Sequence, residues 1–290
     1  MRFSGFLAIT RPTNSCVAGL AAIVAYLIDT SALHRQLPAL LGTMIPEFLL
    51  LFFVVALVTA AGNVINDFFD TKIDAINRPD RPIPSGKVSR GAAQGFAATL
   101  FLAGILVSFF TNALCIGIAI INSLLLIAYA AKLKSTPLLG NVAVAYLAAS
   151  IFLFGGAFNG WSGLVRIIPI AAITFFAMLS RELLKDAEDV EGDEAGGADT
   201  LPIRIGIKKT AEIALIITFF AVAVSFIPYF WWGAWYLGGI IAVDIIIIIA
   251  VVRGLKCVTP ACIKASGASS LLKAGMFASL VVFTLSAVFI

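Results

Sequence analysis

The sequence predicts an all-α, polytopic membrane protein with nine transmembrane helices. Of its 290 residues, 61% are hydrophobic and only 12% are charged, and the mean hydropathy is +1.04. This composition is typical of a bundle of membrane helices, each of which needs about 20 residues to cross a bilayer. Because no polar stretch is long enough to build a soluble domain, we expect a single domain over residues 1–290.

The apolar runs give the predicted helices in order. They lie at residues 13–28, 46–66, 91–110, 113–131, 138–158, 164–184, 210–231, 234–252 and 270–290. The first run is short for a span, and residues 3–10 before it are expected to form an amphipathic helix at the membrane interface. Because no small-residue cleavage site follows, we expect no cleaved signal peptide.

The basic residues predict the orientation. With a cytoplasmic N-terminus, all but Arg35 and Arg166 of the 20 Lys and Arg residues fall on the cytoplasmic side, as the positive-inside rule requires. They follow the loops and form no patch, so no nucleic-acid partner is expected. We therefore expect a multi-pass protein of the cell (plasma) membrane, surrounded by membrane lipids.

Two sets of oxygen-bearing residues share one spacing, with gaps of 4, 3 and 4 positions, which places each set on one face of a helix. The first acidic face, at the end of the second apolar run, consists of Asn63, Asp67, Asp70 and Asp74. The second acidic face, at the end of the sixth run, consists of Glu182, Asp186, Asp189 and Asp193. Solvated loop surfaces are the alternative, but two matched sets on one side of the membrane favour a shared function.

The chemistry of these faces points to a metal and a phosphate. Acidic side chains in membrane segments cost about 2.5–3.5 kcal/mol at a helix centre and mark function. Close carboxylates also repel one another unless a cation neutralises them. With oxygen ligands only, and with the single histidine, His34, in a polar connection, Mg²⁺ is the expected ion, and it usually brings phosphate oxygens. If the two acidic faces lie opposite each other, they would bind a diphosphate through bridging metal ions.

Basic loops follow both faces. In the first, at residues 67–90, three prolines forbid a continuous helix and bring Arg78 and Arg81 back over the helix end. The second, at residues 185–209, also contains Gly and Pro, and both loops are predicted to cap a polar mouth. After the fourth apolar run come Lys132 and Lys134. They either bind phosphate oxygens or serve only to set the orientation of the chain in the membrane.

Several isolated residues carry weaker predictions. Asn14 is either a helix cap or a polar group that reaches the pocket. Asp244, in the middle of the eighth run, is interpreted as a structural hydrogen-bonding group rather than a cavity residue. Asp29 and Glu47, which flank the first outer loop, are expected to be solvated. The four cysteines, which form no CxxC pair, are expected to be inert small hydrophobes.

Longer motifs around the acidic faces resemble the UbiA superfamily of intramembrane prenyltransferases. The first signature has the form NDxxDxxxD at residues 66–74 and continues as NRPDRPIPSG at residues 77–86. The second reads RELLKDAEDVEGD at residues 181–193, with TLP at residues 200–202. The RPTN sequence at residues 11–14 and the stretch at residues 129–141 are also similar, so the resemblance covers nearly the whole chain.

This resemblance implies nine helices around a central cavity, with a lateral opening to lipid and a polar cap on the cytoplasmic side. It also implies that two Mg²⁺ ions bind an isoprenyl diphosphate. The implied catalytic residues are the acids Asp67, Asp70, Asp74, Asp186, Asp189 and Asp193, and the implied metal ligands are these six together with Asn63. The residues expected to bind substrate are Asn14, Asn63, Asn66, Lys72, Arg78, Arg81, Tyr129, Lys132, Lys134 and Lys185.

The opening RPTNSCVAGLAA at residues 11–22 and the compact loops look most like archaeal members of the superfamily that make ether lipids. That similarity implies transfer of a geranylgeranyl group to the glycerol hydroxyl of geranylgeranylglyceryl phosphate, a lipid-like acceptor. One alternative is an aromatic prenyltransferase of quinone biosynthesis, acting on 4-hydroxybenzoate or a naphthoate. Another is a divalent-cation or phosphate transporter, although its ligands would be expected near the bilayer midplane on broken helices.

Overall fold

The computed structural model describes residues 3–31 and 41–289, in which the chain is helical and contains no β-strand. His34 and Arg35, which were named above, lie outside the described residues. The long helices are α2 (Pro12–Ser31), α4 (Ile45–Phe69), α6 (Arg90–Ser108), α7 (Ala113–Ala131), α8 (Leu139–Ala157), α9 (Gly160–Ala195), α11 (Ile207–Ser225), α12 (Tyr229–Leu255) and α14 (Ala268–Phe289). The short elements are α1 (Phe3–Ile9), α5 (Thr71–Asn77), α10 (Leu201–Ile205), α13 (Pro260–Ser266) and the 3-10 turns η1 (Leu41–Thr43) and η2 (Leu133–Ser135).

Each predicted apolar run lies mainly within one long helix, which confirms an all-α membrane protein. The run at residues 210–231 was predicted too long, since α11 ends at Ser225 and α12 begins at Tyr229. Eight helical segments of the described chain are long and apolar enough to cross a membrane. The remaining long helix, α11, has 19 residues but carries Lys208, Lys209 and Glu212 in its first two turns. Nine spans therefore stays a prediction, with α11 as the ninth.

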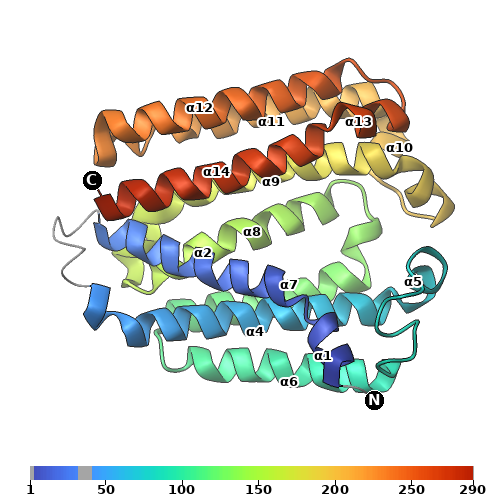
Figure 1. Cartoon of the computed structure of the whole chain (residues 1–290), viewed down its shortest axis with the longest axis horizontal. Coiled ribbons are helices and arrows are strands. Elements are labelled where there is room, and N and C mark those ends of the chain that lie inside the picture. The colour runs from blue at the N-terminus through green and yellow to red at the C-terminus, as the bar shows by residue number, and fades with distance from the viewer. Residues whose placement is uncertain (1–2, 32–40, 290) are drawn as a thin grey trace.

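The long helices lie side by side in one bundle (Figure 1). At one side α9 packs against α11 and α12 against α14, and at the other α4 packs against α6 and α7. Between these groups lie α2 and α8, which pack against each other and against α4 and α9 respectively. The short helices α5, α10 and α13 gather at one end of the bundle, which we call the polar end (right in Figure 1).

The central pair α2 and α8 approaches closely because of Gly155. A β-carbon at this position would lie 2.5 Å from the β-carbon of Ala25 and 2.6 Å from the carbonyl oxygen of Ala22, well inside van der Waals contact. Small residues of this kind let membrane helices pack backbone against backbone. The close contact fixes α2, and with it Asn14, against the helix that separates the two halves of the bundle.

At the end opposite the polar end, an ion pair between a half-buried arginine and a buried acid joins α2 to α9. Arg166 donates to Asp29 from Nε at 2.8 Å and from a terminal nitrogen at 3.1 Å, and Asn159 donates to the same carboxylate at 2.7 Å. The Asp29 side chain is fully buried, so its predicted solvation is wrong. Glu47 is half-buried rather than solvated. Arg166, far along the chain, supplies the positive charge that offsets the free-energy cost of burying the Asp29 carboxylate.

Asp244 is a buried hydrogen-bonding group, as predicted. The Ser225 hydroxyl donates to its carboxylate at 2.7 Å, and the Tyr236 hydroxyl donates to the Ser225 carbonyl at 2.7 Å. This chain of contacts ties the end of α11 to the middle of α12. The acid therefore stabilises helix packing.

The prediction for the cysteines is wrong for two of the four. Cys257 and Cys262 form a disulfide that joins the end of α12 to α13. Cys16 and Cys115 are free thiols, as expected. Sequence spacing did not reveal the pair because only the turn between the two helices brings the sulfur atoms together.

Candidate active site

The first acidic face is continuous although α4 ends inside it. The backbone N–H of Asp70 donates to the Asn66 carbonyl at 2.9 Å, and that of Asp74 donates to the Asp70 carbonyl at 2.8 Å. The helical hydrogen-bond pattern thus continues from α4 into α5. The spacing of 4, 3 and 4 therefore still places the four side chains on one face. This continuous run lies at the polar end. Its carboxylates therefore lie together, outside the apolar part of the bundle.

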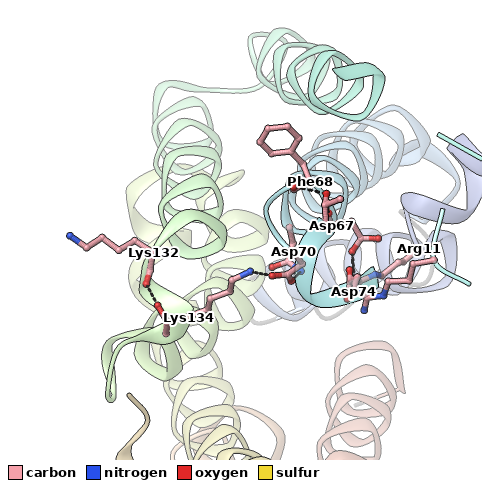
Figure 2. Close-up of polar contacts among 11 residues, drawn as sticks. Arg11, Asp67, Phe68, Asp70, Asp74, Lys132 and Lys134 are labelled. Atoms are coloured by element: carbon pink, nitrogen blue, oxygen red, sulfur yellow. Dashed lines mark hydrogen bonds and ion pairs between the residues drawn. The ribbon is translucent and has the colours of Figure 1, made fainter. Parts of the chain in front are cut away.

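Two arginines neutralise the two buried acids of this face. Arg11 donates to Asp67 at 2.6 Å, and Arg81 bridges Asp67 at 3.1 Å and Asp74 at 2.6 Å. Figure 2 shows Arg11 reaching the acids from the segment that precedes α2. Arg81 therefore returns over the helix end as the prolines predicted. Arg11 was not among the predicted binding residues, although it begins the RPTN sequence that resembles the family.

Asp70 is contacted from the other side of the site. Lys134 in η2 forms an ion pair with Asp70, while Lys132 points away from the acids (Figure 2). Asn66 also donates to Asp70, at 2.8 Å, and Asn63 donates to the Thr10 carbonyl at 3.0 Å. Of the two lysines that sequence could not separate, only Lys134 lies at the first acidic face.

The second acidic face lies entirely within α9, which continues as a helix beyond the predicted apolar run. Asn141 at the start of α8 donates to Asp186 at 2.7 Å, and Lys185 pairs with Asp189 at 2.9 Å one helical turn away. Glu182 pairs with its neighbour Arg181. Asn141 was not among the predicted site residues, although it closes the stretch of residues 129–141 that resembles the family.

One short segment connects the two acidic faces. It runs from η2 to the first turn of α8 and presents Lys134 to the first face and Asn141 to the second. The Ser135 carbonyl in this segment accepts the N–H of Asp199 at 3.1 Å. Half-buried Tyr129 at the end of α7 interacts electrostatically with Asp70 and with Asp186. The two faces therefore border the same space at the polar end.

The loops around this space differ in how tightly they are held. Asp199 accepts a 2.8 Å hydrogen bond from Arg204, and this guanidinium holds the pKa of Asp199 below its ordinary value. Lys72 and Arg78, both predicted to bind substrate, are exposed and form no ion pair within residues 3–31 and 41–289. Their assignment therefore rests on the sequence motif alone.

The donor set fits Mg²⁺, but the acids are not already gathered into a cage. No three His, Cys, Asp or Glu side chains of the described chain stand close enough together to form a metal site by themselves. Instead, most carboxylates of both faces are paired with Arg, Lys or Asn. Because Mg²⁺ commonly binds through one or two carboxylates plus phosphate oxygens and water, this open arrangement suits an ion that arrives with a phosphate substrate.

Two cavities begin beside the acidic faces and run into the bundle. The first cavity, of about 350 Å³, lies among α2, α4, α7 and α8; its wall includes Thr59, one turn before Asn63, and Tyr129. The second cavity, of about 300 Å³, lies among α2, α8, α9, α12 and α14 and reaches Arg181. Both are mostly apolar, and Asn14 lines both. A polar, cation-rich end above apolar cavities suits a substrate with an anionic head and a hydrocarbon tail.

These features define a multi-pass membrane protein whose polar end can bind an anionic head group above apolar cavities. The model of the UbiA prenyltransferase family matches residues 15–285, and the chain belongs to this family of prenyltransferases.

Relatives and solved structures agree over the full length. The chain is 64% identical to the digeranylgeranylglyceryl phosphate synthase of Methanoregula boonei over all of both chains, and 55% identical to that of Methanoculleus marisnigri over 99% of this chain and 100% of the relative. A structure of a digeranylgeranylglyceryl phosphate synthase matches with a TM-score of 0.84 and 37% identity over 99% of both chains. A UbiA homologue from Archaeoglobus fulgidus bound to GPP and Mg²⁺ shares the fold, with a TM-score of 0.62 and 16% identity over 96% of this chain and 99% of the other.

Proposed function

We propose that this prenyltransferase moves a geranylgeranyl group from its diphosphate to the glycerol hydroxyl of geranylgeranylglyceryl phosphate. The observation that carries the proposal is the pair of acidic faces, which border one space through the segment that holds Lys134 and Asn141. The full-length similarity to digeranylgeranylglyceryl phosphate synthases supports the choice of acceptor. Apolar cavities beside that space have the character that the isoprenoid tails need.

The residues of the site have separate tasks in this reaction. The metal ligands would be Asn63, Asp67, Asp70 and Asp74 of the first face and Asp186, Asp189 and Asp193 of the second. Two Mg²⁺ ions, when bound, would supply charge neutralisation on the leaving diphosphate. A UbiA homologue bound to GPP and Mg²⁺ supports the choice of ion and the class of donor. The acids thus position the diphosphate head at the polar end while its tail enters the bundle.

Transfer breaks the bond between C1 of the donor and its diphosphate oxygen, and the diphosphate leaves with the electron pair. The acceptor hydroxyl oxygen forms the new bond to C1, and its proton passes to the departing diphosphate, the base that the bond cleavage produces. Arg11, Arg81 and Lys134 lie where they can stabilise the charge that grows on the departing diphosphate. The apolar cavities exclude water, which would otherwise capture the allylic cation.

The proposed setting is the plasma membrane, with the polar end in the cytoplasm. The distribution of Lys and Arg supports this orientation. All the basic groups that contact the first acidic face then lie on the side that supplies Mg²⁺ and soluble phosphates.

Lys134→Met is expected to lower kcat at least about 30-fold, because a cation in contact with the site stabilises the leaving diphosphate. Lys132→Met, two residues away with its side chain turned outward, should change kcat less than about 3-fold, as is usual for a surface charge. Initial rates at saturating Mg²⁺ and saturating substrates measure both. If both variants lost the same fraction of kcat, Lys134 would have no specific role in the site.

The proposed acceptor is tested with purified protein in lipid nanodiscs supplied with Mg²⁺ and labelled geranylgeranyl diphosphate. Geranylgeranylglyceryl phosphate and 4-hydroxybenzoate are offered in parallel, and products are identified by mass spectrometry. Product from the glyceryl phosphate alone is expected. Product from the aromatic acid alone would overturn the acceptor assignment and establish the quinone-type alternative.

A further inference from the structure

The second cavity differs from the first in the charges on its wall. The first is lined by the neutral polar groups of Asn14, Thr59, Asn122, Tyr129 and Ser150, besides apolar side chains. The second is lined by two cations, Arg181 on α9 and Lys273 on α14, and is otherwise largely apolar. Positive charge beside a mostly apolar cavity suits an amphiphile with an anionic head.

Both cations have unused capacity to bind an anion. Arg181 contacts Glu182 through one terminal nitrogen, while its buried Nε has no hydrogen-bond partner in the described chain. Lys273 is exposed and forms no ion pair with any described residue; its ammonium nitrogen lies over the Phe277 ring, 6.0 Å from the ring centroid. Cations on membrane helices are costly without an anionic partner, so this pair favours a bound anion.

The cations of the second cavity are separate from those that meet the first acidic face. Arg11, Arg81 and Lys134 are already paired with the carboxylates of that face, where the donor diphosphate is expected. Lys273 belongs to α14, which contributes nothing to those contacts. Arg181 instead pairs with Glu182 of the second acidic face, so the cations lie on different sides of the site and could serve two anionic substrates.

The two cavities share one wall, formed by Asn14, Ala148, Ile151 and Met178. A tail in each cavity would place the two heads beside this wall, near the entrance of both. The shared wall is therefore where an acceptor hydroxyl in the second cavity could reach C1 of a donor in the first. Asn14, which lines both cavities, is positioned to orient that hydroxyl.

We propose that the second cavity is the acceptor subsite, in which Arg181 and Lys273 bind the phosphate of a polyisoprenyl glyceryl phosphate and the apolar wall holds its chain. This inference rests on the proposed function and adds the residues that select a phosphate-bearing acceptor. The first cavity then holds the tail of the donor. Selection follows because an acceptor without phosphate leaves two cations unpaired beside an apolar cavity.

The test measures phosphate preference, defined as kcat/KM for geranylgeranylglyceryl phosphate divided by kcat/KM for its dephosphorylated alcohol. Lys273→Gln is expected to lower this ratio about 10-fold, the loss of one charge-assisted contact, while KM for geranylgeranyl diphosphate stays unchanged. Lys273→Arg should retain the preference. Lys264→Gln, an exposed lysine on neighbouring α13 that lines neither cavity, is the matched control and should also retain it.

An unchanged ratio in Lys273→Gln, or an equal fall in Lys264→Gln, would overturn the assignment, because the effect would then be absent or due to general surface charge. If the wild-type protein forms no product from either acceptor, the proposed reaction itself is wrong. Binding of radiolabelled geranylgeranylglyceryl phosphate in donor-free nanodiscs then decides about the cavity. Weaker binding to Lys273→Gln than to Lys264→Gln supports the subsite, and equal binding rejects it.

Discussion

Asp67→Asn and Asp186→Asn are each expected to lower kcat at least about 1000-fold, the scale on which enzymes lose rate when charge stabilisation at the reacting group is removed. Each change keeps the size of the side chain but removes one negative charge, so one acidic face can no longer hold its metal. Asp67 also contacts Arg11 and Arg81, whose positions the acid fixes. Single-turnover rates at saturating Mg²⁺ measure the loss.

Two matched controls separate this effect from a general loss of acidity. Asp80→Asn changes an exposed acid in the loop that follows the first face, and Glu191→Gln changes an exposed acid on α9 just beside the second face. Both should keep turnover within about 3-fold of the wild type, as surface charges usually do. Near-native turnover in either Asp67→Asn or Asp186→Asn would show that the ligand assignment is wrong.

Arg166→Leu is expected to destabilise the fold by about 3–5 kcal/mol, since removal of one partner leaves the other charge of a buried ion pair uncompensated. Asp29 is the charge left behind, and its side chain is fully buried. Thermal unfolding in mild detergent, followed by circular dichroism, should show a clear fall in midpoint. Turnover below the midpoint should stay close to that of the wild type, because the pair lies at the end opposite the acidic faces.

The double change Asp29→Asn with Arg166→Leu removes both charges and should recover most of the lost stability. Recovery of this kind is expected because the cost arises from the unpaired charge rather than from the lost contact. A double variant as unstable as Arg166→Leu alone would instead assign the loss to packing around the guanidinium.

The acidic faces could be predicted from sequence because helical periodicity is local. Gaps of 4, 3 and 4 place Asn63, Asp67, Asp70 and Asp74 on one face of a helix whatever the rest of the chain does. The apolar runs were equally informative, since every one of them became a long helix. The prolines after the first face also placed Arg81 correctly.

Contacts between distant residues could not be predicted in the same way. Whether Lys132 or Lys134 meets Asp70 depends on the fold of η2, and the pairing of Asn141 with Asp186 depends on how α8 packs against α9. Asp29 looked like a loop acid because its partner, Arg166, lies far along the chain. Lys273 carried no local motif, and only the cavity between helices reveals it.

The most direct test of the central claim, that the two acidic faces jointly bind one diphosphate through metal ions, is a count of bound Mn²⁺ by electron paramagnetic resonance. The protein in nanodiscs is titrated with Mn²⁺ in the presence of geranylgeranyl thiolodiphosphate, an unreactive donor analogue. We expect about two Mn²⁺ ions per chain, as in other two-metal phosphate sites, and about one in Asp67→Asn or Asp186→Asn. Uptake of Mn²⁺ that does not depend on the analogue, or a count unchanged in both variants, would contradict the account.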